Sequence, residues 1–89
     1  MALLTFTKNL ERHVACPAAT VTGATVHDLL EHYFVAHPGV RGYVVDERGA
    51  LRKHINVFVD GNQIGDRGGL SDEVTADSQV YVMQALSGG

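Results

Sequence analysis

The sequence predicts an α+β fold in which one main helix packs across a mixed β-sheet. Three observations lead to this prediction: a helical segment after Thr25 has one apolar face, β-forming runs precede it, and richer ones follow it. A helix with one apolar face must bury that face against another layer, and a sheet provides such a layer. With 45% apolar and 19% charged residues, the chain has the composition of a folded protein, and its 89 residues suffice for a single small core.

Two strands are expected near the start of the chain. The segment 3–7, Leu-Leu-Thr-Phe-Thr, is rich in β-forming residues, and Lys8-Asn9 would end it. A weaker strand at 18–22 closes at Gly23, whereas 11–15 fits neither pattern clearly. Because the connection between the two strands is short, we expect them to form a hairpin.

The strongest local signal is the start of the helix. Thr25 can cap the amide groups of the first turn, and Asp28 places a negative charge near the positive end of the helix. Apolar residues then recur at three- and four-residue steps: Val26, Leu29, Leu30, Tyr33 and Phe34. Pro38 disfavours the α conformation at the residue before it, so the helix should end at 37–39.

The second half of the chain should supply the remaining strands. We expect a short strand at 42–46, the central strand at 55–59, a brief return strand at 62–64, one helical turn at 70–72 and the last strand at 78–83. Asp60-Gly61, directly after the central strand, is a hairpin signal. This order of elements fits the β-grasp, or ubiquitin-like, architecture, whose first and last strands lie parallel at the centre of the sheet.

The last three residues of the sequence are Ser87, Gly88 and Gly89. Glycine loses the most backbone freedom on ordering and brings no side chain to pack, so we expect a single domain over 1–89 with a flexible tail from about 84 to 89. Six extended residues after Met83 span roughly 20 Å, enough to carry a terminal carboxylate into a partner's cleft. Taken alone, the two glycines are equally consistent with a frayed end.

Composition and size argue against several classes of function. A chain this short is too small for a deep catalytic cleft walled by two lobes, so an enzyme is not expected. The seven basic residues are scattered along a sequence with a formal net charge of −3, which argues against binding to nucleic acid phosphates. With one cysteine, and neither a leader nor a long apolar segment, we expect a cytoplasmic protein without membrane contact.

Several segments together resemble the ThiS/MoaD-type sulfur carriers, a family of ubiquitin-like proteins. They are Gly23-x-Thr25-Val26-x-x-Leu29-Leu30, the run from His54 to Gly61, Gly69-Leu70 and the terminal Gly88-Gly89. The resemblance implies a carrier that binds no cofactor and catalyses nothing itself. An E1-like enzyme would use ATP to adenylate the carboxylate of Gly89, a sulfur donor would convert it to a thiocarboxylate, and a downstream sulfur-incorporating enzyme would consume the sulfur.

The resemblance leaves the pathway open among cysteine-type, molybdopterin, thiamin and related biosynthesis. Many molybdopterin synthase small subunits have a proline shortly before the diglycine, where this chain has Gln84-Ala85-Leu86, and a Gly-Asp pair where it has Asp77-Ser78. Two other functions fit the same tail. One is a ubiquitin-like modifier joined through Gly89 to a lysine of another protein, and the other is an interaction module with a passive tail.

Alternation along the strands predicts a partner-binding surface beside the tail. If the odd-numbered residues of 55–59 face the helix, then Phe58 faces the opposite side, and so do Tyr81 and Met83 on the last strand. We expect these three residues, with Leu86, to bind the activating enzyme, because exposed aromatic and methionine side chains are typical of interface cores. The alternative is that a loop covers them or that they are separate surface residues.

The histidines and the cysteine do not form a recognisable chemical site. His27, His32 and His37 are spaced by five residues, whereas two imidazoles on one helix face need a spacing of four, so no metal site is expected. Cys16 could act as a nucleophile if a cation lowered its pKa, but a structural thiol is the simpler interpretation.

The sequence also contains an internal pair of glycines and several basic residues outside the segments discussed so far. Gly68-Gly69 cannot be a second activation site, because Leu70 follows and leaves no free carboxylate there. Arg52, Lys53 and Arg67 are either solvated surface charges or contacts for an acidic face of a partner.

Overall fold

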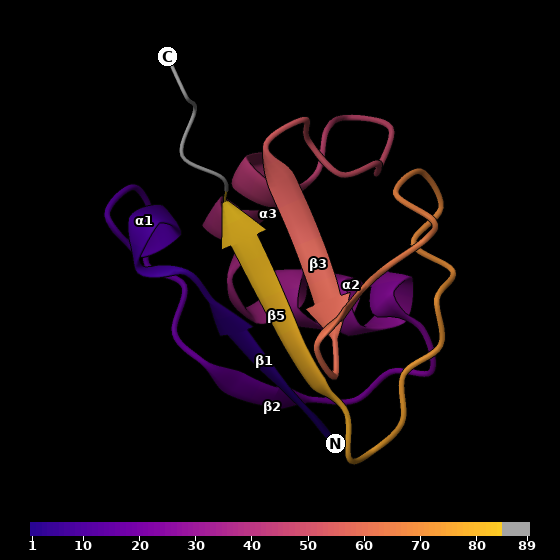
Figure 1. Ribbon diagram of the computed structural model, residues 1–89. Helices are drawn as coiled ribbons and strands as arrows, with labels where there is room; N and C mark the ends of the chain where they lie inside the picture. The colour runs from indigo at the N-terminus through magenta and orange to yellow at the C-terminus, as the bar shows by residue number, and fades with distance from the viewer. Residues whose placement is uncertain (85–89) are drawn as a thin grey trace.

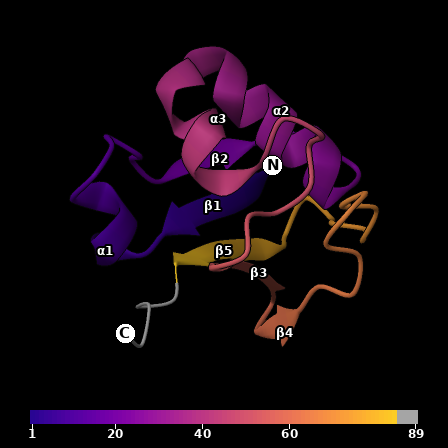
Figure 2. The same ribbon diagram turned by 90° about the horizontal axis from the view of Figure 1, so that it is seen from above.

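A five-stranded mixed sheet, with its strands in the order β2-β1-β5-β3-β4, carries helices on one face (Figures 1 and 2). This computed structural model describes residues 1–84. The elements are β1 (Ala2–Phe6), α1 (Lys8–Glu11), β2 (Ala19–Val21), α2 (Val26–Ala36), α3 (Pro38–Val44), β3 (Ile55–Val59), β4 (Asn62–Gln63) and β5 (Gln79–Gln84). The predictions for Leu86, Ser87, Gly88 and Gly89, and for a flexible tail beyond Gln84, lie outside the described residues.

The two central strands come from opposite ends of the chain. β1 and β5 run parallel, with Leu4 beside Val80, while β5 and β3 run antiparallel, with Val57 beside Val82. β2 and β4 are added antiparallel at the outer edges. The predicted β-grasp fold, with a mixed sheet and one main helix across it, is therefore confirmed.

Helix α2 begins as the sequence predicts. The Thr25 hydroxyl oxygen accepts a hydrogen bond from the backbone N–H of Asp28 at 3.2 Å, which satisfies one of the free amides of the first turn. Each of the predicted apolar residues of α2 is at most 4% exposed: Val26, Leu29, Leu30, Tyr33 and Phe34. Burying such side chains contributes about 1.5–3 kcal/mol each, so this stripe fixes α2 on the sheet.

The predicted strand at 42–46 is wrong, because residues 42–44 are the last turn of helix α3, which ends at Val44. Pro38 occupies the first helical position, where its fixed φ suits a helix and its missing N–H costs no bond. Val40 and Val44 are four residues apart and are both at most 1% exposed, so a helix places both in the core. Val45 alone makes a strand-like contact, an isolated bridge to Leu51.

Two shorter predictions also differ from the structure. Lys8-Asn9 does not simply end the first strand but begins α1, a single turn whose Leu10 is fully buried. The helical turn expected at 70–72 is absent from the described chain, because Leu70 has a φ of +56°, outside the right-handed helical region. Its carbonyl accepts a hydrogen bond from the N–H of His27, so this loop supports the start of α2.

Gly23, in the connection before α2, is required by close packing. A β-carbon at this position would lie 2.6 Å from the backbone N and 2.9 Å from the Cα of Leu29. We expect Gly23→Ala to destabilise the domain by about 1–3 kcal/mol, because backbone atoms of a helix cannot move aside as a flexible side chain can. Thermal unfolding of the purified protein measures this effect.

Gly42→Ala is the matched control. A β-carbon at Gly42 meets nothing within 4 Å, and the residue lies inside α3, where alanine is favoured over glycine by up to about 1 kcal/mol. The two variants should therefore shift the melting temperature in opposite directions. Equal shifts would contradict the packing argument.

Candidate functional site

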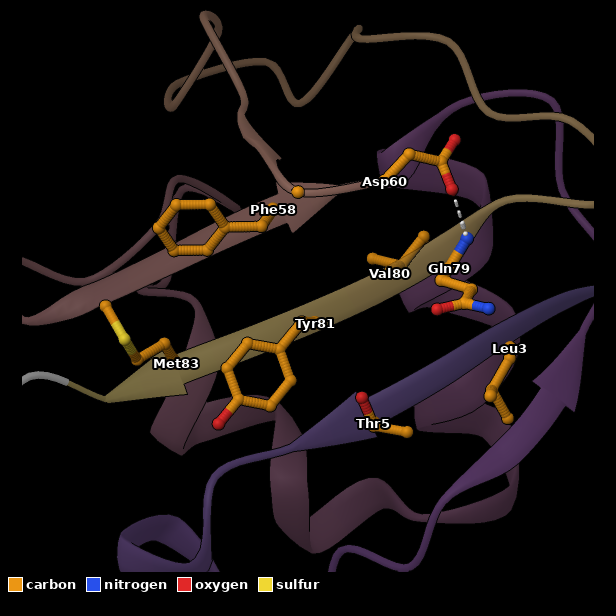
Figure 3. Close-up of a pocket in the computed structure, with 9 residues that line it drawn as sticks. Leu3, Thr5, Phe58, Asp60, Gln79, Val80, Tyr81 and Met83 are labelled. Carbon is orange, nitrogen blue, oxygen red and sulfur yellow. Dashed lines mark hydrogen bonds between the residues drawn. The ribbon is translucent and has the colours of Figure 1, made fainter.

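Phe58, Tyr81 and Met83 lie together on one face of the sheet (Figure 3), and α2 and α3 cover the other face (Figure 2). Phe58 on β3 is directly paired with Tyr81 on β5, and Met83 is two residues further along β5. Tyr81 is 40% exposed, whereas Phe58 and Met83 are half-buried. Their inward neighbours Val57 and Val82 are fully buried. The structure thus brings the three side chains together, and their role in binding a partner stays a prediction.

These side chains line an open hollow of about 520 Å³. β1 contributes Leu3 and Thr5 to the same hollow, since β1 lies directly beside β5 (Figure 3). Sequence reasoning missed both residues, although the alternation that buries Leu4 and Phe6 also places Leu3 and Thr5 on the opposite face of the sheet. We call this surface, formed by Leu3, Thr5, Phe58, Tyr81 and Met83, the open face.

One end of the open face carries a carboxylate. Asp60 follows β3, has a φ of +50° and lines the hollow. Its Oδ1 accepts a hydrogen bond from the backbone N–H of Gln79 at 2.9 Å (Figure 3). In return the N–H of Asp60 donates to the carbonyl of Gln79 at 2.8 Å, so the start of β5 is tied to the end of β3.

At its other end β5 leaves the sheet between two neighbouring segments (Figure 1). The N–H of Gln84 donates to the hydroxyl of Thr7 at 3.2 Å, and its side-chain oxygen accepts from the amide of Asn9 at 3.1 Å. On the other side Gln84 is paired with Ile55 of β3. The point from which Leu86, Ser87, Gly88 and Gly89 follow is therefore fixed on both sides, although those four residues lie beyond the described part.

The remaining candidates form no second site. Cys16 is 2% exposed; burial, and secondarily the Glu11 carboxylate, raises the pKa of its thiol, which disfavours the thiolate needed for nucleophilic chemistry. The imidazole of His32 is hydrogen-bonded through Nδ1 to the carbonyl of Thr22 at 2.6 Å. Within residues 1–84 no three His, Cys, Asp or Glu side chains gather as a metal site would require.

Asp66 and Asp72 hold their loop together through hydrogen bonds that sequence reasoning did not identify. Asp66 accepts from the hydroxyl and N–H of Ser71 and from the N–H of Gly69, while Asp72 accepts from the N–H groups of Gly65 and Asp66. These bonds lower the pKa of both carboxyls. The largest contribution comes from the Ser71 hydroxyl for Asp66 and from the Gly65 amide for Asp72. They favour the ionised form and hold the loop that supports α2.

This arrangement predicts a specific sensitivity to acid. A carboxyl whose pKa is lower in the folded state stabilises the protein above its unfolded pKa of about 3.9, and this contribution is lost as the pH falls through the lowered value. Between about pH 5 and pH 2, the melting temperature of the wild-type chain should therefore fall more steeply than that of Asp66→Asn/Asp72→Asn. Asp77→Asn, at an exposed turn, is the matched control. Parallel curves for wild type and double variant would refute the prediction.

A model of the family described as ThiS matches residues 15–89, most of the chain. This chain belongs to the ThiS family. The matched segment includes β3 and β5, with Phe58, Tyr81 and Met83 of the open face, and the diglycine. No curated protein sequence matches the chain.

Solved structures share the fold of this ThiS-family chain over nearly its whole length. A chain of the BexX/CysO complex from Amycolatopsis orientalis is 26% identical, with a TM-score of 0.84 and all of both chains covered. SAMP1 from Haloferax volcanii is also 26% identical, with a TM-score of 0.78, covering 99% of this chain and 98% of that one. CysO from Mycobacterium tuberculosis, at 17% identity, has a TM-score of 0.81 over 97% of this chain and 100% of its own.

Family and fold together make the chain a ubiquitin-like protein of the sulfur-carrier or modifier type. None of the helices described in the structure is long and apolar enough to cross a membrane.

Proposed function

We propose that the protein is a sulfur carrier whose Gly89 carboxylate is adenylated by an E1-like enzyme and converted to a thiocarboxylate. The observation that carries this proposal is the match to the ThiS family, which extends through Gly88-Gly89 to residue 89. The geometry of β5 supports it, because this central strand delivers the following residues from a fixed point beside the open face. An extended segment of five residues beyond Gln84 spans roughly 17 Å.

The chemistry explains why a partner with ATP is needed. A carboxylate resists nucleophiles because attack adds charge to an anion and oxide is a poor leaving group. When a carboxylate oxygen of Gly89 attacks the α-phosphorus of ATP, pyrophosphate leaves and an acyl adenylate forms. Sulfide (HS⁻) supplied by the sulfur donor then attacks the acyl carbon, AMP departs with the electron pair of the broken C–O bond, and loss of the S–H proton leaves a thiocarboxylate.

In this reaction the protein is a cosubstrate of the activating enzyme and the carrier of the sulfur atom. Donors that stabilise the developing charge on phosphate and acyl oxygen belong to the activating enzyme. Glycines at 88 and 89 would pass through a channel too narrow for a residue with a β-carbon. The open face would dock on the enzyme, with Leu86 as a further anchor, and a downstream sulfur-incorporating enzyme would then take the sulfur.

The alternative function is a protein modifier, which the similarity to SAMP1 from Haloferax volcanii favours. Both functions share adenylation of Gly89 and differ in the group that attacks the adenylate. Sulfide gives a thiocarboxylate, whereas a lysine amine of another protein gives an isopeptide.

Intact-mass spectrometry of the chain isolated from its own cells tests the proposal. A sulfur carrier should show exchange of one oxygen for sulfur, located on Gly89 by fragmentation. A modifier should instead leave a branch ending in Gly88-Gly89 on lysines of other proteins. A chain that acquires neither group, and that its cognate adenylating enzyme with ATP leaves unchanged, would refute both functions.

A further inference from the structure

Lysines flank the point where β5 leaves the sheet. Lys8 follows Thr7, whose N–H donates to the carbonyl of Val82 and whose hydroxyl accepts from the N–H of Gln84. Lys53 comes two residues before Ile55, the partner of Gln84 on β3. Both side chains are exposed, and they are the only lysines in the sequence. Figure 1 shows α1, which starts at Lys8, and the start of β3 on either side of the end of β5.

Two arginines continue this basic surface, Arg67 toward the open face and Arg52 toward α3, where its Nε donates to the carbonyl of Gly42 at 2.6 Å. Arg67 donates from one guanidinium nitrogen to the side-chain oxygen of Asn56 at 2.8 Å, and from the other to the carbonyl of Arg52 at 2.9 Å. Asn56 is the cross-strand partner of Met83, so the Arg67 guanidinium is fixed beside the edge of the open face. We call Lys8, Arg52, Lys53 and Arg67 the basic collar.

The collar residues form no ion pair in the described part of the chain, and the acidic residue that shares a helix with one of them is Glu11, three residues after Lys8 on α1. Across residues 1–84 the structure contains one ion pair, Arg41 with Glu31 on the helical side of the molecule. Four of the seven basic residues therefore gather at one end of β5, although the net charge of the chain is −3. The other end of β5 carries Asp60, bonded to the N–H of Gln79, and Asp77 two residues before it. The open face is thus bounded by opposite charges at its two ends.

We propose that the basic collar binds an acidic rim around the channel of the enzyme that receives the diglycine. This inference rests on the proposed function and adds a property of its partner. The five residues that form the open face carry no charge, and an apolar face alone allows docking in more than one orientation. Charge at one end selects the orientation that places the tail at the channel mouth and speeds encounter. A nucleic acid partner is disfavoured, because the acidic end of β5 would repel phosphates.

The test compares variants with equal net charge. Lys8→Gln/Lys53→Gln removes two positive charges from the collar, whereas His27→Glu/Val35→Glu adds two negative charges on the exposed side of α2. At low salt, the collar variant should show about a tenfold lower kcat/KM for adenylation by the cognate enzyme, with kcat unchanged. The difference should vanish near 1 M salt, where charges are screened beyond about 3 Å. The control on α2 should match wild type.

Failure of the inference is separable from failure of the proposed function. If the wild-type chain is adenylated and the collar variant matches it, or if both variants fall equally, then the collar has no specific acidic partner. If the collar variant is adenylated normally but loses retention on an RNA column, a nucleic acid partner replaces the acidic enzyme. If the wild-type chain itself is never adenylated, the proposed function is refuted.

Discussion

Removal of Gly89 should abolish adenylation while leaving the folded domain intact. The shortened chain still ends in a carboxylate, but that group falls short of its place by about 3.3 Å, the length of one extended residue. Misplacement of a reacting group by only 1 Å can cost on the order of 10²-fold in rate, so the loss should be at least that large. ATP–pyrophosphate exchange with the cognate activating enzyme measures it.

Two controls distinguish the effect of a shorter tail from the effect of a destabilised domain. Gly89 brings no side chain to pack against the core, so the melting temperature of the shortened chain should equal that of wild type. Ser87→Ala keeps the length of the tail and both glycines, and it should be adenylated at the wild-type rate. Activation of the shortened chain at the wild-type rate would exclude Gly89 as the acceptor.

The parts of the fold that were predicted correctly are those in which local and long-range signals agree. In α2 the Thr25 cap, the apolar stripe and the stop before Pro38 all indicate one helix, and that helix is observed. In α3 they conflict, because β-forming residues fill a segment that Pro38 starts as a helix and that buries Val40 and Val44. In α3 the burial of two valines on one helix face outweighs the preference of the individual residues for a β-strand.

The candidate site could be predicted in part, because some of its residues are placed by a local pattern and others only by long-range strand pairing. Alternation within a strand places Phe58, Tyr81 and Met83 from the sequence alone, whereas their assembly with Leu3 and Thr5 needs the parallel pairing of β1 with β5. The basic collar is a still longer-range feature. Lys8 and Lys53 are 45 positions apart in the sequence, and each is brought beside Gln84 only by the strand order. Basic residues that are scattered along the chain therefore gather at one end of a strand.

Replacing the central aromatic residue of the open face should have the second largest effect. Phe58→Asp removes a ring that is paired with Tyr81 and forces a carboxylate into the apolar hollow on docking. Central aromatic anchors of interfaces contribute about 2 kcal/mol or more, so KM for the activating enzyme should rise about 30-fold. Steady-state adenylation kinetics and direct binding by calorimetry measure the change.

Matched variants determine whether the loss reflects docking. Phe58→Leu keeps an apolar side chain and should lose far less than Phe58→Asp. Val35→Asp puts the same charge on the exposed side of α2, which covers the other face of the sheet, and should leave KM unchanged. Because Phe58 is half-buried and not part of the central core, the melting temperature of each variant must be measured beside its kinetics. A folded Phe58→Asp chain that is adenylated with the wild-type KM would show that the activating enzyme binds elsewhere.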